Sequence, residues 1–253
     1  MKYEFLYTNG CSHTNHTPDP PLELHEHEKW PWYLKELMGV EYFNNAEGAG
    51  SNDRIFRTSE KFLRTTNIDK EKILAVIQIT YPYRFEMPSI YNSSGWQSYI
   101  TDRGVKEVGD YSEKGQINYE FYQARLNMLA TNEEMEAWYY YQQVSAINNL
   151  FRGHNVDCFL INSFHPKHRQ YKNNVSGLPD CFTENFEFDN NSIDWLIPGD
   201  PRASDIMCLP QRLGYYEMND IIIKPTVDGH FNSIFNKAIA EYIYKNIFDE
   251  EDL

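Results

Sequence analysis

Short apolar segments alternate with amphipathic ones along much of the chain. Ile73–Thr80 is apolar nearly throughout, which predicts a strand buried on both faces of a parallel sheet. The first apolar segment ends at Asn9-Gly10, a dipeptide typical of sharp turns. The strands predicted in this way are Tyr3–Thr8, Val40–Phe43, Ile73–Thr80, Val156–Ser163 and the short Ile221–Ile223.

Helical patterns fill the intervals between these strands. Gly39 suits the C-terminal cap of the first helix, and Ser51-Asn52-Asp53 is an N-cap cluster that opens the second. The predicted helices are Trp30–Met38, a helix from the cap cluster to about Arg64, a region from Tyr119 to Leu150 with a break near Thr131-Asn132, and Phe231–Phe248. Strands that alternate with helices predict an α/β fold: a three-layer α/β/α, flavodoxin-like, doubly wound parallel sheet.

Ligands of such sheets bind outside the carboxyl ends of the strands. This rule places Asn9–Ser12, Gly48–Gly50 and Thr80-Tyr81 on one rim. We expect one domain over residues 1–253, interrupted by insertions at about 81–150 and 165–220. The first insertion begins with loops and a hairpin, and the second is irregular and punctuated by prolines. Substrate specificity would come from the loops at 81–117 and 165–220.

The charge balance excludes several classes of partner. The 253 residues include 23 Lys+Arg and 37 Asp+Glu, a net charge of −14, so we expect no binding to nucleic acid or to an anionic membrane. Aromatic residues make up 15% of the chain and supply a sizeable core. No apolar run approaches the roughly 20 residues of a membrane helix, and the start of the chain lacks a signal-peptide pattern.

The cysteines indicate a reducing compartment. Four of them are scattered without a CxxC pair (Cys11, Cys158, Cys181 and Cys208), which favours free thiols over disulfides or a zinc ribbon. We expect a cytoplasmic protein, or a virion component if the source is viral, with no cofactor and no metal.

Ser12 is the first candidate for chemistry. It follows the first strand on a tight turn and faces the rim, but a serine hydroxyl needs a base to take its proton. Asp228-Gly229-His230 lies just before the last helix, and alternate residues of an extended segment point to the same side. Asp228 would then orient His230, and the three side chains suit acyl transfer.

Several motifs resemble those of the SGNH (GDSL-like) hydrolases, in the order in which that family carries them. Gly10-Cys11-Ser12-His13-Thr14 resembles the first block, with Cys where many members have Asp. Asn45–Asn52 resembles the second block, in which a strand-end Asn precedes a glycine by five. Trp30–Leu37 is similar to the helix that joins these blocks, and Asp228-Gly229-His230 resembles the fifth block.

The resemblance implies a serine esterase or acetylhydrolase that forms an acyl-enzyme and cleaves a small-molecule or glycan ester, with O-acetyl groups on a carbohydrate as one example. Ser12 would be the nucleophile, His230 the general base and Asp228 its orienting carboxylate. The backbone N–H groups of Ser12 and Gly50 would form the oxyanion hole.

Two features depart from the family pattern. The third block normally supplies an Asn side chain to the oxyanion hole, but here the strand runs into Thr80-Tyr81-Pro82-Tyr83-Arg84. Thr80 or Arg84 would have to replace that donor, and losing one donor costs roughly 100- to 1,000-fold in turnover. The second departure is Asp-x-His in place of Asp-x-x-His, so Asp228 lies one position closer to the histidine than in the family pattern.

Other interpretations stay open for single residues. Ser12 could cap the first helix, Cys11 could replace it as the nucleophile, and Asp228-Gly229 could be only a turn. Asn52 and Asp53 are interpreted as helix caps. The four N-terminal histidines offer ligand types for a metal, although alternating His and Glu favours a solvated loop (His13, His16, His25 and His27).

Two other functions compete with ester hydrolysis. A catalytically weak or inactive SGNH-fold protein could serve as a binding or structural component, which the missing third-block Asn favours. A flavodoxin-like protein could instead use the turn Thr8–Asn15 as a cradle for a flavin phosphate, but Asp228-Gly229-His230 would then have no role.

Overall fold

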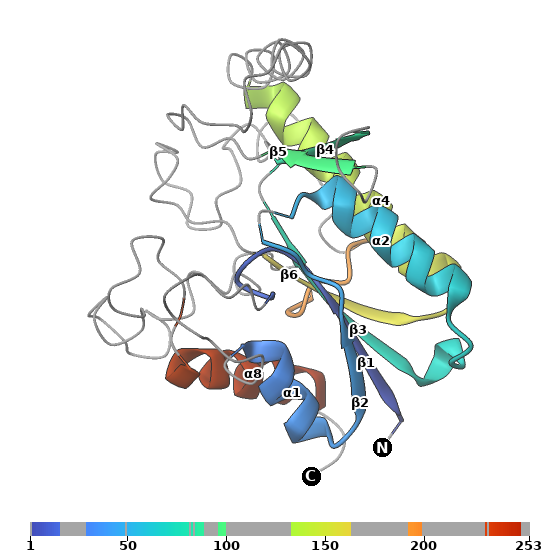
Figure 1. Cartoon of the computed structure of the whole chain (residues 1–253), viewed down its shortest axis with the longest axis vertical. Coiled ribbons are helices and arrows are strands. Elements are labelled where there is room, and N and C mark those ends of the chain that lie inside the picture. Colours follow the sequence, from blue (N-terminus) through green and yellow to red (C-terminus); the bar gives the residue numbers. More distant parts are fainter. Residues whose placement is uncertain are drawn as a thin grey trace.

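Four parallel strands form the central sheet of the computed structural model (Figure 1). They are β1 (Phe5–Asn9), β2 (Glu41–Asn44), β3 (Ile73–Ile79) and β6 (Asp157–Asn162), in the order β2-β1-β3-β6. The structure describes residues 2–15, 29–48, 50–80, 82, 84–88, 96–99, 133–162, 192–198, 231 and 233–248. Each predicted strand within these ranges is confirmed to within two residues at either end.

The strand order creates a switch point between β1 and β3. From β1 the chain first adds β2 on one side, and β3 then pairs with the other side of β1. Both pairings are parallel, so the segments after β1 and β3 leave the sheet at the same edge. In doubly wound sheets this crevice is where ligands bind. Ser12 follows β1 and Thr80 follows β3 directly, so both predicted site residues flank the switch point.

Helices cover both faces of the sheet (Figure 1). On one face α1 (Trp30–Met38) packs with α8 (Ser233–Phe248), and on the other α2 (Asn52–Thr65) packs with α4 (Glu133–Gly153). All of β3 is buried: alternate residues such as Leu74 and Val76 face α1 and α8, while Ile77 faces α2 and α4. The three-layer α/β/α architecture is therefore confirmed.

The helix ends follow the local signals of the sequence. Ser51 is the N-cap of α2, and its side chain accepts a hydrogen bond from Arg54 N. Gly39 ends α1 in the left-handed conformation at φ 65°, where a residue without a Cβ is favoured. The helix predicted from Tyr119 is described only from Glu133 onward, because residues 100–132 lie outside the described ranges.

Two smaller features lie beside the sheet. The hairpin expected after β3 is present as antiparallel β4 (Phe85–Pro88) and β5 (Trp96–Tyr99), which lies near α2 and α4 in Figure 1. A 3-10 turn, η2 (Lys70–Lys72), precedes β3. Trp195 forms a parallel bridge with Leu160 of β6, so the irregular second insertion returns to the sheet at this point. The short strand predicted at Ile221–Ile223 falls outside the described residues, and no described helix has the length and apolar character needed to cross a membrane.

Candidate active site

Ser12 lies in a tight turn directly beyond β1. The Cys11 carbonyl accepts hydrogen bonds from Thr14 N at 2.9 Å and Asn15 N at 2.8 Å, which closes the turn around Ser12. Ser12 is partly buried, whereas Cys11 is 1% exposed with its thiol against Gln78. Of the two candidate nucleophiles, Ser12 is thus the more accessible. Lys29, not Ser12, is the N-cap of α1, so Ser12 does not cap that helix.

Side chains from three other elements hold this turn in place. Gln78 of β3 accepts a hydrogen bond from Thr14 Oγ1, and its oxygen lies 3.6 Å from Cys11 Sγ. Asn44 at the end of β2 donates to the Thr14 carbonyl at 2.9 Å. Lys29, the residue before α1, donates from its Nζ to the Ser12 carbonyl at 3.2 Å. The position of Ser12 is therefore set by tertiary contacts on both sides.

The loop after β2 reaches the same rim and packs against Gly10. Glu47 N donates to the Gly10 carbonyl at 3.3 Å, and a Cβ on Gly50 would lie 2.7 Å from that carbonyl oxygen. Only glycine fits at position 50 without displacing backbone. Gly50 N donates to the Glu47 carbonyl at 2.9 Å, so an incoming oxyanion would have to share this donor with Glu47.

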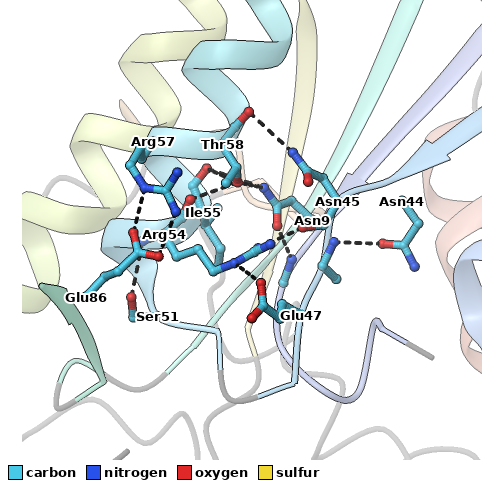
Figure 2. A network of polar contacts seen from close by, with 12 residues as sticks. Asn9, Asn44, Asn45, Glu47, Ser51, Arg54, Ile55, Arg57, Thr58 and Glu86 are labelled. Atoms are coloured by element: carbon cyan, nitrogen blue, oxygen red, sulfur yellow. Dashed lines mark hydrogen bonds and ion pairs between the residues drawn. The ribbon is translucent and has the colours of Figure 1, made fainter. Parts of the chain in front are cut away.

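A partly buried polar network connects this rim to α2 (Figure 2). Asn9 is fully buried: its Oδ1 accepts from Gly10 N at 2.9 Å, and its Nδ2 donates to Thr58 Oγ1 at 2.9 Å. Arg54 of α2 donates to Glu47 at 2.6 Å and to the Asn45 carbonyl at 2.8 Å. The network therefore joins both rim loops to one helix, which restricts their relative movement.

Tyr7 lies at the buried end of the same network. Its hydroxyl contacts Ser59 Oγ and Asn9 Nδ2 at 3.1 Å and Asn45 Nδ2 at 3.2 Å. Burial raises the pKa of Tyr7, because a phenolate would be poorly solvated there. The hydroxyl therefore stays protonated at neutral pH and serves the network as a neutral partner.

The third strand ends in a second polar cluster, centred on Thr80. Asn52 Oδ1 accepts from Thr80 N at 2.8 Å, and Asn52 Nδ2 donates to the Thr80 carbonyl at 2.9 Å and to Gln143 at 3.0 Å. The interpretation of Asn52 as a cap is wrong, because Ser51 caps α2 and Asn52 instead completes the hydrogen bonds of a strand end. Asp53 likewise accepts from Gln143 Nε2 at 3.1 Å.

The two residues considered as the missing oxyanion donor differ in accessibility. Thr80 is fully buried and its N–H is bonded to Asn52. Arg84 is partly exposed and donates through Nη1 to Thr80 Oγ1 at 3.2 Å. A guanidinium carries several N–H donors, so Arg84 could contact an oxyanion and Thr80 together.

Asp228 and His230 lie outside the described residues, but the next residue in the chain is described. The ring of Phe231 lies 5.1 Å from the ring of His13, the neighbour of Ser12. The Phe231 carbonyl accepts from Asn236 Nδ2 at 3.0 Å. His13 and Phe231 are therefore in contact, although they are 218 positions apart in the sequence. Each is the chain neighbour of a residue of the predicted triad.

The sequence predictions missed three side chains that hold this region together. Gln78 is the single amide in an otherwise apolar strand, which is a recognisable signal. Asn236 follows the spacing of the buried residues Ile239, Ala240 and Ile243 on the closing helix, so a polar residue stands on an apolar face. Lys29 gives no comparable signal, because a lysine before a helix is expected in solvent.

Possible metal ligands do not gather in the part of the chain that the structure describes. No group of three or more His, Cys, Asp or Glu side chains there could hold an ion. His13 packs against Phe231, while His16, His25 and His27 lie outside the described ranges. Cys11 and Cys158 are both buried and free, and burial raises the pKa of the Cys158 thiol well above its usual value.

No protein-family model and no curated protein matches this chain. Solved structures with a similar course of the chain include a protein assigned to the lipolytic G-D-S-L family from Desulfitobacterium hafniense DCB-2, at 10% identity over 96% of this chain and 99% of that one, with a TM-score of 0.50. A member of the same family from Veillonella parvula DSM 2008 is 11% identical over 97% and 98% of the two chains, with a TM-score of 0.48.

The psychrotrophic esterase EstA from Pseudoalteromonas sp., in a structure inhibited by monoethylphosphonate, is 10% identical over 97% of this chain and 95% of that one, with a TM-score of 0.47. Identities near 10% leave the fold as the shared property. The parallel sheet, its two helical layers and the structural likeness agree: this chain has the α/β fold of the lipolytic G-D-S-L family protein from Desulfitobacterium hafniense.

Proposed function

We propose that this protein is an SGNH-type serine hydrolase that cleaves an ester of a small molecule or a glycan. Ser12 is the nucleophile, His230 the general base and Asp228 the carboxylate that orients it. The observation that carries the proposal is the contact between His13 and Phe231. It joins the immediate chain neighbours of Ser12 and His230 at the edge of the sheet where doubly wound folds bind ligands.

The reaction proceeds in two displacements. His230 takes the proton of the Ser12 hydroxyl while Oγ bonds to the ester carbonyl carbon. When the tetrahedral intermediate collapses, the bond to the alcohol oxygen breaks and His230 returns the proton to the leaving alcohol. Water then attacks the acyl-enzyme, loses a proton to His230 and releases the acid, which restores Ser12.

The oxyanion would bind to the backbone N–H of Ser12 with help from Gly50 and Arg84. Gly50 N has the Glu47 carbonyl as a competing acceptor at 2.9 Å, which weakens its contribution. Arg84 follows β3, the strand after which the family pattern places the third-block Asn. Its positive charge would stabilise the negative charge that develops on the oxyanion. Replacing Arg84 by Met should therefore lower kcat by roughly 100- to 1,000-fold if it supplies the donor.

A catalytically weak or inactive binding protein is the second candidate. The backbone N–H groups of Gly50 and Thr80 both have partners within the protein, at 2.9 Å and 2.8 Å. A functioning oxyanion hole has donors free to receive substrate. If the partners in this structure persist when a ligand binds, stabilisation of the transition state would be poor.

Labelling with a fluorophosphonate probe, followed by intact-mass analysis, separates the two candidates. We expect one adduct on the wild type, the same adduct on Cys11→Ala, and none on Ser12→Ala. His230→Ala should lower turnover of p-nitrophenyl acetate at least about a thousandfold, and Asp228→Ala should lower it by less. Circular dichroism provides the control that each variant is folded. A folded wild type that takes no label would favour the binding protein.

A further inference from the structure

Asn236 of α8 is 1% exposed and forms hydrogen bonds to two segments that meet beside it. Its Oδ1 accepts from Trp30 N at 3.2 Å, at the start of α1. Its Nδ2 donates to the Phe231 carbonyl at 3.0 Å. One carboxamide therefore joins the first turn of α1 to the residue that follows His230.

The start of α1 needs such a partner. The first N–H groups of a helix have no acceptor within the helix, and Lys29, the N-cap of α1, provides no side-chain cap. Asn236 supplies an acceptor for the first of these N–H groups, that of Trp30. Since this acceptor comes from α8, the two helices are held in register at this end.

Lys29 extends the connection to Ser12. The residue is 4% exposed, and its Nζ donates to the Ser12 carbonyl at 3.2 Å. Burying a lysine is unfavourable unless its ammonium group is hydrogen-bonded, so the contact constrains both partners. Lys29 and Trp30 are consecutive, so the residue that binds Ser12 is directly followed by the residue that binds Asn236.

The third side of this arrangement is the ring contact between His13 and Phe231. Contacts therefore connect the Ser12 turn to the start of α1, the start of α1 to Asn236, Asn236 to Phe231, and Phe231 back to the Ser12 turn. A general base must lie within about 2.6–3.2 Å of the atom whose proton it takes, and a misplacement of about 1 Å can cost about 100-fold in rate. A fixed relation between these segments is what such a distance requires.

We propose that Asn236 is a positioning residue, which holds Phe231, the residue after His230, against the Ser12 turn through the first turn of α1. This inference rests on the proposed function. Asn236 is an amide on the apolar face of α8, and the two hydrogen bonds described above both end on segments next to the proposed catalytic residues. Lys29 is a second positioning residue, because it connects the start of α1 to the Ser12 carbonyl.

Asn148 of α4 offers a matched control. It is fully buried, its Oδ1 accepts from Asp194 N at 2.9 Å, and its Nδ2 donates to the Ser192 carbonyl at 3.2 Å. Asn148 therefore makes the same two kinds of bond on the opposite face of the sheet. These bonds go to Ser192 and Asp194, and not to the Ser12 turn or to α1. Asn236→Ala and Asn148→Ala should lose comparable stability.

The experiment measures the rate of fluorophosphonate labelling of Ser12 as a function of probe concentration. For Asn236→Ala we expect the maximal rate to fall about 100-fold while the half-saturating concentration changes by less than about threefold. Asn148→Ala should label at the wild-type rate despite a similar fall in Tm. Equal rates for folded Asn236→Ala and wild type would overturn the inference.

Lys29→Met keeps the test decisive if Asn236→Ala does not fold. It should slow labelling in the same way, and Lys29→Arg should recover part of the rate. Lys35→Met, which removes contacts to Glu36 and Trp32 within α1, should change nothing. Lys29→Met labelled at the wild-type rate would overturn the inference. If the wild type itself takes no label, the proposed function fails first; labelled wild type with unaffected variants would reject the positioning role alone.

Discussion

Gly50 lies where the loop after β2 passes closest to Gly10. A Cβ at position 50 would lie 2.7 Å from the Gly10 carbonyl oxygen and 3.0 Å from the Glu47 carbonyl oxygen. Neither atom belongs to a flexible side chain, so the backbone of the rim would have to shift. A Cβ on Gly10 would meet Thr14 Oγ1 at 2.6 Å and Gln78 Cβ at 2.8 Å. The two glycines are thus required by close packing around Ser12.

Gly50→Ala should destabilise the protein by about 1–3 kcal/mol, the usual range for inserting a methyl group into a well-packed site. It should also slow the labelling of Ser12. Gly153→Ala is the control: a Cβ there has no atom within 4 Å, so we expect no loss and a gain of up to about 1 kcal/mol. Urea denaturation measures both. A Gly50→Ala variant as stable as wild type would contradict the close packing of the rim.

At the scale of elements, an ion pair connects the hairpin to α2 (Figure 2). Arg57 contacts Glu86 of β4 through Nε and Nη2, both at 2.7 Å. The side chain of Glu86 is 4% exposed, while that of Arg57 is 32% exposed. The buried carboxylate depends on this bidentate contact, because an unpaired charge at that depth would be poorly solvated.

Glu86→Ala should destabilise the protein by about 1–3 kcal/mol, a range reduced for the partial exposure of Arg57. The control is Glu60→Ala, since Glu60 and Arg64 of α2 form an exposed pair at 3.4 Å whose loss should cost only about 0.3–0.5 kcal/mol. Amide hydrogen exchange should show faster exchange in β4 for the first variant alone. Equal exchange in both variants would mean that the ion pair does not hold the hairpin.

The elements themselves followed from local signals. Apolar runs identified the strands, Ser51 and Gly39 marked helix ends, and the hairpin was expected after β3. The parallel bridge of Trp195 to Leu160 was not predicted, because a single paired residue has no periodicity to recognise. The prediction that Asn52 is a helix cap was wrong because its hydrogen-bond partner, Thr80, is distant in sequence and no local pattern indicates that pairing.

At the scale of the whole molecule, Tyr3 joins the beginning, middle and end of the chain. Its hydroxyl donates to Asp157 of β6 at 2.8 Å, and its ring lies 6.2 Å from that of Phe248 in α8. Burial and the neighbouring Asp157 carboxylate raise the pKa of Tyr3 to about 12. The ionised phenolate is disfavoured there because it would be desolvated and next to a like charge.

This shift links stability to alkaline pH. The pKa of a tyrosine in the unfolded chain is near 10, so the unfolded state loses its proton first and unfolding becomes easier as pH rises from about 10 to 12. The stabilisation is fully present below pH 10 and is lost as pH passes the folded-state pKa. Tyr3→Phe should therefore show a smaller fall in unfolding midpoint between pH 10 and 12 than wild type. Thermal unfolding across that interval measures it, and identical slopes would exclude a contribution from Tyr3.

The sequence by itself determined the four strands of the central sheet, the ends of α1 and α2, and the α/β class, and it named Ser12, Asp228 and His230 as candidates. Each of these depends on residues close together in the chain, where periodicity and turn preferences act. Only the tertiary structure decided the strand order and the side chains that hold the Ser12 turn. Trp30 and Asn236 are 206 positions apart, and no local pattern records such a pairing. Buried polar groups must find partners wherever the fold brings them, so the positions of Gln78, Lys29 and Asn236 became meaningful only when the layers were assembled.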